Sequence, residues 1–197
     1  MSGAARIEPA TEPLTPTIAE RMAKIFPPGL PLPQLYLIMA RNEPLFAQIV
    51  DMGLIGPTGL LDRRSMPKVL RETIILRTCV AARNDYEFNL HVQTISERMG
   101  LTRQQIEDVR TPHPTAALWP DDILAAMRLV DGLVQRIEVL DEVYARARGH
   151  FDEPTLIEMT QIVGLYTGVA MLVALARPRF DHYQSGPPVL ARLEAAP

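Results

Sequence analysis

Apolar residues recur every three or four positions along several long stretches of the chain. Three of these stretches, residues 68–111, 121–153 and 155–177, contain no proline. Helix interiors exclude proline because it lacks an N–H group and clashes with the preceding turn, so these stretches can form long helices. The chain has no alternating apolar and polar pattern of the length that indicates a strand. The pattern predicts an all-α bundle of about seven to eight helices.

Cap residues and proline set the expected helix boundaries. Ser65 is the expected N-cap of a central helix, with Pro67 in its first turn. Thr102 and Gln105 have the spacing of a capping box, and Asp152 is the expected cap of the last helix. The expected helices cover residues 15–26, 33–52, 68–82, 85–99, a short segment from 102, 121–138, 141–149 and a final helix after 152.

The length of the chain, 197 residues, predicts one domain. Residues 1–17 are rich in proline, and we expect them to form a flexible N-terminal arm. Residues 18–176 are expected to form a single all-α domain, and residues 177–197 a C-terminal tail.

Composition and charge exclude several classes of function. A formal net charge of −3 gives no basic surface for nucleic acid. The single cysteine, Cys79, excludes an intramolecular disulfide, a CxxC redox pair and a multi-thiolate zinc site. Residues 1–17 lack the features of a signal peptide, and the uncharged segment 159–176 is interpreted as a core helix rather than a membrane span. We therefore expect a cytoplasmic protein.

Glu72 stands out on the expected central helix because its helical neighbours are apolar. At 100° per residue, Ile75, Leu76 and Cys79 share its face. A carboxylate in such surroundings either points into a core or borders a pocket, and burial raises its pKa toward the range useful for proton transfer. The alternative is an ion pair with a basic neighbour such as Arg71.

Glu87 and His91 lie four residues apart, on one face of the next expected helix, and Asn84 lies on the same side. A carboxylate beside an imidazole forms a proton donor and acceptor pair, because it raises the imidazole pKa and fixes its tautomer. A plain surface pair is the alternative. Two ligands without an HExxH motif do not make a metal site, and no glycine-rich phosphate loop is present, so we expect neither metal nor cofactor.

Four motifs occur in an order that resembles the carboxymuconolactone decarboxylase and alkylhydroperoxidase D family. They are RETIILR at 71–77, NDYEFNLH at 84–91, MGLT at 99–102 and EMTQIVGLY at 158–166. The likeness covers roughly residues 35–176. The resemblance implies an all-α fold of the alkylhydroperoxidase D-like type, assembled into homo-oligomers, trimers or hexamers, with sites near the subunit interfaces.

The resemblance also separates two branches of the family. Its peroxidase branch uses a CxxC pair whose cysteines match Asn84 and Glu87, together with a glutamate matching Glu72 and a histidine matching His91. This chain lacks both thiols, and Cys79 has no partner for the exchange that peroxide reduction needs. The resemblance therefore implies the decarboxylase-type branch and not a thiol peroxidase.

By this resemblance the chain is a cofactor-free lyase that removes CO2 from a small carboxylated lactone or a related enolisable acid. His91 is the expected proton donor, Glu87 orients it and Glu72 completes the relay. Arg77 is the candidate anchor for an anionic substrate, although a structural ion pair is the alternative, and Tyr86 and Asn84 are further candidate binding residues. A lactone hydrolase or isomerase at the same site, or a non-catalytic oligomeric binding protein, remains the alternative function.

Overall fold

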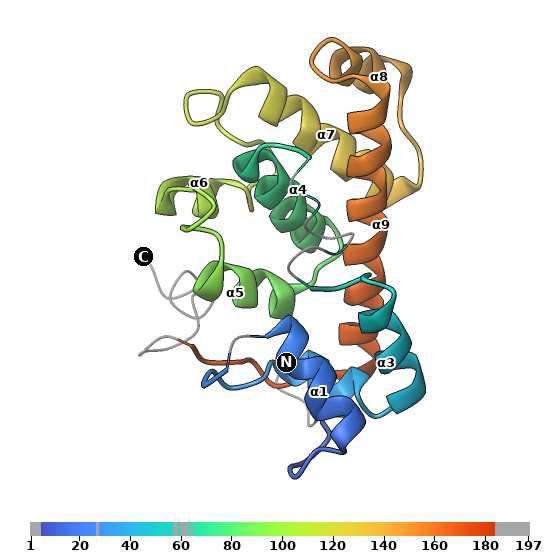
Figure 1. The fold of residues 1–197 in the computed structure, drawn as a ribbon. Coiled ribbons are helices and arrows are strands. Elements are labelled where there is room, and N and C mark those ends of the chain that lie inside the picture. The colour runs from blue at the N-terminus through green and yellow to red at the C-terminus, as the bar shows by residue number, and fades with distance from the viewer. Residues whose placement is uncertain (1–4, 27, 57–58, 60–62, 64, 184–197) are drawn as a thin grey trace.

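The computed structural model describes residues 5–26, 28–56, 59, 63 and 65–183, and in these residues it contains nine helices and no strand (Figure 1). The helices are α1 (Pro16–Ile25), α2 (Gln34–Met39), α3 (Glu43–Asp51), α4 (Lys68–Ala81), α5 (Asp85–Thr94), α6 (Arg103–Asp108), α7 (Asp121–Arg136), α8 (Asp141–Arg148) and α9 (Glu153–Ala176). The all-α prediction is therefore confirmed, with more helices than expected.

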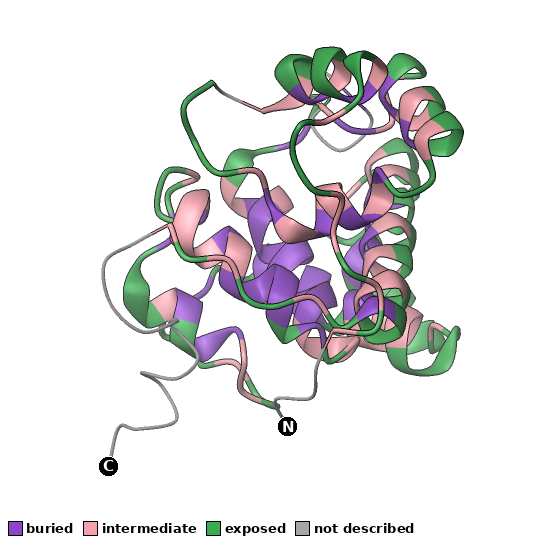
Figure 2. Cartoon of the chain, turned by 90° about the horizontal axis from the view of Figure 1, so that it is seen from below, coloured by how far each residue is buried: buried purple, intermediate pink, exposed green. Residues whose placement is uncertain are grey.

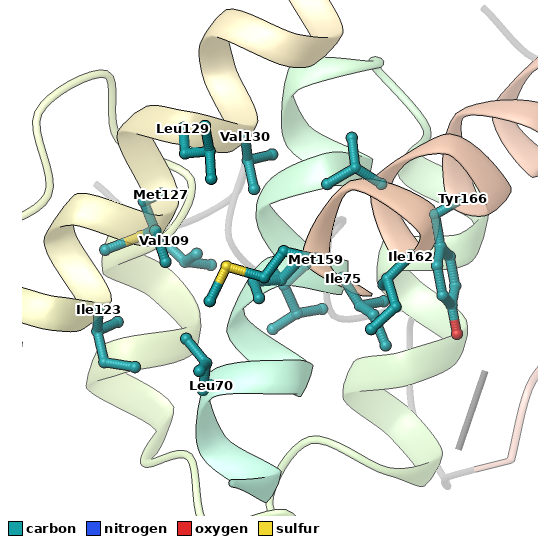
Figure 3. Close-up of a cluster of buried hydrophobic side chains, with 14 of the residues drawn as sticks. Leu70, Ile75, Val109, Ile123, Met127, Leu129, Val130, Met159, Ile162 and Tyr166 are labelled. Carbon is teal, nitrogen blue, oxygen red and sulfur yellow. The ribbon is translucent and has the colours of Figure 1, made fainter. Parts of the chain in front are cut away.

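The centre of the molecule is α4, which packs against α5, α7 and α9. Every residue from 72 to 79 is buried, so this helix is enclosed on all sides, and Figure 2 shows buried residues gathered in the central helices. Apolar side chains of α4, α7 and α9 interlock around it, among them Ile75, Met127 and Ile162 (Figure 3). Each such side chain contributes about 1.5–3 kcal/mol to folding, which fixes the helices that carry the polar residues.

A second, smaller core joins the N-terminal helices. Ile18 and Met22 of α1 pack with Phe46 and Val50 of α3. In Figure 1, α1 and α3 lie at the end of the molecule where α9 ends. Backbone hydrogen bonds from Arg6 and Ile7 to the Ala176 carbonyl join the start of the described chain to the end of α9.

The helix expected over 33–52 is wrong as a single element. The chain forms α2 and α3 with a break at residues 40–42. Asn42 caps α3 by accepting a hydrogen bond from the Leu45 N–H at 3.3 Å, and Pro44 lies in the first turn of that helix. An Asn cap followed by a proline that cannot continue a preceding helix is a start signal, so the break has a local cause.

Ser65 is not the N-cap of the central helix. Pro67 occupies that position, and the Ser65 hydroxyl donates instead to the Glu158 carboxylate of α9. Proline at the cap has no N–H group, so no intrahelical donor is lost there. The Ser65 side chain thus links the segment before α4 to α9.

The helix after residue 85 ends at Thr94, five residues earlier than expected. Ile95 leaves helical geometry, and the Ser96 N–H bonds to the His91 carbonyl. Gly100, at φ 103°, completes the turn toward α6. This early end places Ser96 inside the protein, where it is fully buried.

Two caps agree with the sequence prediction. Thr102 and Gln105 form both hydrogen bonds of a capping box at the start of α6, and Asp152 caps α9 by accepting from the Thr155 N–H at 3.0 Å. Both depend on residues within one turn of each other.

The last helix, α9, is not buried all round as expected. It buries one face and exposes another, with Ile157, Met171 and Leu175 more than half exposed. By length and composition α9 is apolar enough to cross a membrane, and the core helix of a soluble protein passes the same test. Its buried face, which includes Met159, packs on α4, α5, α7 and α8.

Candidate active site

Glu72 lies at the middle of α4 and is fully buried. Its Oε1 and Oε2 atoms lie 3.0 and 3.2 Å from Nδ1 of His91 on α5. The Ser96 hydroxyl donates a second hydrogen bond to Oε1 at 2.7 Å. The carboxylate is thus held by two partners that follow α4 in sequence, in agreement with the prediction that Glu72 faces inward.

The other ring nitrogen of His91 faces two different groups. Nε2 lies 3.3 Å from the hydroxyl oxygen of Tyr166 on α9 and 3.5 Å from Oε1 of Glu87, one turn earlier on α5. The Tyr166 and His91 rings meet edge to face, with centroids 5.5 Å apart. Figure 3 shows the Tyr166 hydroxyl at the edge of the apolar core, pointing away from the labelled aliphatic side chains.

In the structure, Glu72 and Glu87 exchange the roles that the sequence predicts for them. Glu72, and not Glu87, bonds to Nδ1 and fixes the orientation of the His91 ring. Glu87 lies instead on the Nε2 side, where a reacting group would approach. Three helices, α4, α5 and α9, therefore supply the cluster of Glu72, Glu87, His91 and Tyr166.

Two carboxylates control the charge of His91. Burial alone would lower the pKa of the imidazole, but the charge and hydrogen bond of Glu72, supplemented by Glu87, raise it to about 10. Burial opposes ionisation of Glu72, yet the imidazolium of His91 and the Ser96 hydroxyl hold the Glu72 pKa below its ordinary value. At neutral pH the pair is therefore an imidazolium bonded to a carboxylate. Burial and the Glu87 charge raise the pKa of Tyr166 well above its ordinary value, so its phenol stays protonated.

At the N-terminal end of α5, two buried polar atoms have no hydrogen-bond partner among the described residues. The Asn84 side chain caps α5 by accepting from the Glu87 N–H at 3.2 Å, but its Nδ2 donor is buried and unbonded. Oε2 of Glu87 is likewise buried without a partner. Leaving a buried polar atom unbonded costs about 1–3 kcal/mol, so such atoms call for a reason. A donor and an acceptor on the face that carries His91 suit a polar ligand.

Tyr86 has a different task from the one expected. Its hydroxyl donates to the Asp181 carboxylate and accepts from the Leu35 N–H at 3.0 Å. Phe180 stacks on its ring at 6.4 Å. Burial and the charge of Asp181 raise the pKa of Tyr86, which keeps the phenol a donor. Tyr86 thus joins α5 to the start of α2 and to the segment after α9, and its hydroxyl forms no hydrogen bond with His91.

Arg77 does not reach the acid–base cluster. Its Nε and Nη2 atoms bond to Oδ1 and Oδ2 of Asp131 at 2.7 and 2.6 Å, and Nη1 donates to the carbonyl oxygens of Val109 and Thr111 at 2.8 and 2.7 Å. These bonds hold α4, α7 and the end of α6 together. The structure therefore favours the structural ion pair over the substrate anchor.

Cys79 is fully buried on α4, and burial raises its thiol pKa well above the ordinary value. A thiol kept protonated in this way is a poor nucleophile. Within the described part of the chain, no group of three or more histidine, cysteine, aspartate or glutamate residues has the arrangement of a metal site.

Two partners of the acid–base pair, Ser96 and Tyr166, were not predicted from the sequence. Ser96 falls inside the helix expected over 85–99, and no local signal marks it as a carboxylate partner. Tyr166 ends the EMTQIVGLY motif, one of the four motifs that resemble the family, and this motif is the sequence feature that points to Tyr166. His91 and Glu87 keep little exposure, 4% and 8%, and four cavities lined by described residues lie elsewhere, none of them including Glu72, Glu87 or His91.

Comparisons with known proteins agree with this architecture. The model of the carboxymuconolactone decarboxylase family matches residues 57–131. Among solved structures, the apo debrominase Bmp8 is similar at 16% identity and a TM-score of 0.74, covering 89% of this chain and 92% of Bmp8. A cysteine-to-alanine variant of Bmp8 in complex with 2,3,4-tribromopyrrole is similar at 17% identity and a TM-score of 0.71, covering 92% of this chain and 94% of that one.

At these identities the likeness to Bmp8 shows a shared fold. No curated protein matches the chain. The matched segment includes α4 and α5, and with them Glu72, Glu87 and His91. The part of the chain that is similar to the carboxymuconolactone decarboxylase family therefore carries all three of these acid–base residues.

Proposed function

We propose that the protein is a cofactor-free enzyme in which the His91 imidazolium donates a proton to carbon. The leading reaction is decarboxylation of a small carboxylated lactone or a related enolisable acid. The family-model match over residues 57–131 and the fold shared with Bmp8, a debrominase, support an enzyme. The observation that carries the proposal is the buried imidazole of His91, bonded through Nδ1 to Glu72 while Nε2 faces Glu87 and Tyr166.

The proposed chemistry needs one proton for each CO2 released. The bond between the carboxylate and the ring carbon breaks, and its electron pair moves into the conjugated carbonyl as an enolate. The carbon then takes the Nε2 proton of His91, and water restores the proton to the neutral imidazole. Glu72 stabilises the imidazolium and holds its ring in one orientation.

Asn84, Glu87 and Tyr166 are proposed to bind the substrate in this site. The unbonded Nδ2 donor of Asn84 and the Tyr166 hydroxyl suit a carbonyl or carboxylate oxygen, where negative charge develops during the reaction. Oε2 of Glu87 can accept a hydrogen bond from a substrate hydroxyl or from the water that restores the proton.

A second candidate follows from the same unbonded carboxylate oxygen. Glu87 can act as a base that removes a proton next to a carbonyl group, with His91 returning a proton elsewhere, which is isomerisation without loss of CO2. Thiol chemistry is not proposed, because Cys79 is buried, protonated and without a second cysteine.

The test is a panel of carboxylated lactones and keto acids incubated with the purified protein in D2O. A decarboxylase releases CO2 and places one deuterium in the product, whereas an isomerase exchanges deuterium without CO2. His91→Gln should abolish either activity, while His150→Gln, at an exposed position on another part of the chain, serves as the matched control. Turnover that survives His91→Gln contradicts the proposal, and binding without turnover across the panel favours a non-catalytic binding protein.

We also propose that the chain is a cytoplasmic homo-oligomer. The support for a homo-oligomer comes from the exposed side of α9. This side carries Ile157, Met171 and Leu175 beside Gly164 and Gly168. A Cβ atom placed on either glycine meets nothing within 4 Å, so another helix can approach closely there. Light scattering of the native chain and of Leu175→Glu tests this, because a charge in a subunit interface should reduce the molar mass.

A further inference from the structure

A cavity of about 650 Å³ lies on the side of the bundle where α4 ends, separate from the acid–base cluster. Its walls come from the end of α4, the loop after α6 and one face of α7, and its lining includes Arg77, Val80, Arg83, Arg110, Asp131 and Val134. A smaller cavity of about 300 Å³ shares Val80, Arg83 and Arg110 with it. Cavities of this size hold small organic ligands.

Three guanidinium groups line the larger cavity, and their charges are not equally balanced. Arg77 is neutralised by its bidentate pair with Asp131. No ion pair or side-chain hydrogen bond joins Arg83 or Arg110 to another residue of the described chain. Asp131 lines the larger cavity and Asp85 lines the smaller one, so three arginines face two aspartates and the two cavities together keep an excess of positive charge.

The backbone of Arg83 adds a second observation. Arg83 follows α4 at φ 55°, and the next N–H, that of Asn84, bonds back to the Cys79 carbonyl at 2.7 Å. This is the position after a helix at which glycine is strongly favoured, because a side chain there strains the backbone. Ile137 and Arg177 take the same left-handed conformation after α7 and α9, so the conformation is a helix-end feature. At Arg83 it leaves the side chain on the lining of both cavities.

Arg110 is positioned differently, by an aromatic ring. Its guanidinium carbon lies 5.2 Å from the centroid of the Phe88 ring. Stacking on an aromatic face orders the planar group while leaving its N–H atoms available to an anion. Two guanidinium groups on one cavity can therefore offer paired donors to a carboxylate.

We propose that this cavity binds a small organic carboxylate, with its charged end between Arg83 and Arg110 and its apolar end against Val80 and Val134. The lining of the cavity supports this orientation, because its remaining walls include Ala81 and Ala82. The site is independent of the proposed reaction, since none of Glu72, Glu87 and His91 lines it.

The experiment uses benzoate as the probe and the full-length chain, with binding followed by calorimetry and by amide NMR shifts. We expect a benzoate Kd of about 1–10 mM, which corresponds to about 3–4 kcal/mol of binding free energy. The amides of Arg83, Arg110 and Val134 should shift in the titration. Benzamide, which has the same shape without the charge, should bind at least about tenfold more weakly.

Arg83→Gly is the decisive variant because it removes the charge at a position that favours glycine. Benzoate affinity should fall about tenfold, while the Tm should hold or rise by about 2–4 °C, so a loss of binding cannot result from unfolding. Arg110→Gln should weaken benzoate to a similar extent. Arg103→Ala is the matched control, because Arg103 is exposed, lines neither cavity and pairs with Glu97.

Several results would overturn the proposal. Benzoate that shows no binding at about 20 mM, about twice the weakest expected Kd, contradicts it. Benzoate affinity that is unchanged by Arg83→Gly also contradicts it. Equal affinity for inorganic phosphate and benzoate also contradicts it, because the apolar end would then contribute nothing. None of these outcomes bears on the acid–base chemistry at His91, which the CO2 and deuterium assays test separately.

Discussion

Nδ1 of His91 lies 3.0 Å from Oε1 of Glu72, and the same carboxylate oxygen accepts a hydrogen bond from Ser96. A fully buried carboxylate is costly unless it is paired and hydrogen-bonded, and Glu72 meets both conditions. The ion pair holds the imidazolium of His91 inside the protein, and Nε2 is the ring nitrogen that Glu72 does not bind. This relationship makes the charge of His91 the centre of the proposed site.

Replacing Glu72 with glutamine should return the pKa of His91 toward its ordinary value, because the carboxylate that raises it is gone. Proton donation should fall about 100-fold or more at neutral pH. Imidazole NMR titration measures the pKa, and turnover of any substrate found in the panel measures the rate. Ser96→Ala is the control, since it removes one hydrogen bond from Glu72 but keeps the charge. An unchanged His91 pKa in Glu72→Gln contradicts the proposed pair.

Protein stability should decrease as the pH rises from about 6.5 to about 10. The folded pKa of His91 is raised to about 10 from an ordinary value of 6.5. Below pH 6.5 the folded and the unfolded protein both carry the His91 proton, and the stabilisation is complete. Between pH 6.5 and pH 10 only the folded protein keeps this proton. The free energy of unfolding therefore falls by up to a few kcal/mol by pH 10. Urea unfolding at a series of pH values measures this slope. The slope should be smaller in His91→Gln. Equal slopes in the native protein and in this variant would contradict the raised pKa of His91.

Arg77→Ala should destabilise the fold by about 3 kcal/mol, because it leaves Asp131 and two backbone carbonyl groups without their partner. Urea unfolding checks the value. Arg103→Ala, which breaks an exposed pair with Glu97, should cost less than about 1 kcal/mol. A variant of Arg77 that stays as stable as the native chain but loses substrate affinity would restore Arg77 as a substrate anchor.

Tyr86→Phe should loosen the segment that follows α9 without disturbing His91. The change removes the hydrogen bonds of Tyr86 to Asp181 and to the Leu35 N–H, each worth about 1–3 kcal/mol. Hydrogen exchange should become faster at Leu35 and over residues 177–183, while exchange in α7 stays the same. Tyr144→Phe, at an exposed position on α8, is the matched control. Protection at Leu35 that equals the native value would contradict the role of Tyr86.

Much of the helix pattern was accessible from local sequence. The capping box of Thr102 and Gln105 and the Asp152 cap were predicted correctly, because each depends on groups within one turn. The helix expected over 33–52 was wrong although its break has a local signal, the Asn42 cap followed by Pro44. The end of α5 at Thr94 had no comparable signal, since the turn there forms around the buried side chain of Ser96.

The contacts of the candidate site likewise divide into those that local sequence predicts and those that depend on the packing of the helices. Glu87 and His91 meet because they lie four residues apart on one helix, so spacing alone predicted their contact. Spacing could not show which carboxylate bonds to Nδ1, nor that Arg77 faces Asp131, because these contacts join different helices. For the same reason the unbonded atoms of Asn84 and Glu87 become visible only once every neighbour is placed.

The sequence by itself determined an all-α chain, the acid–base residue types and the face of α5 that carries Glu87 and His91, because helical periodicity is a property of adjacent residues. Only the tertiary structure decided that Glu72 pairs with His91, 19 residues away, and that Tyr166 approaches it from 75 residues away. The depth and crossing of packed helices set these contacts, and they depend on how the whole core fills its space.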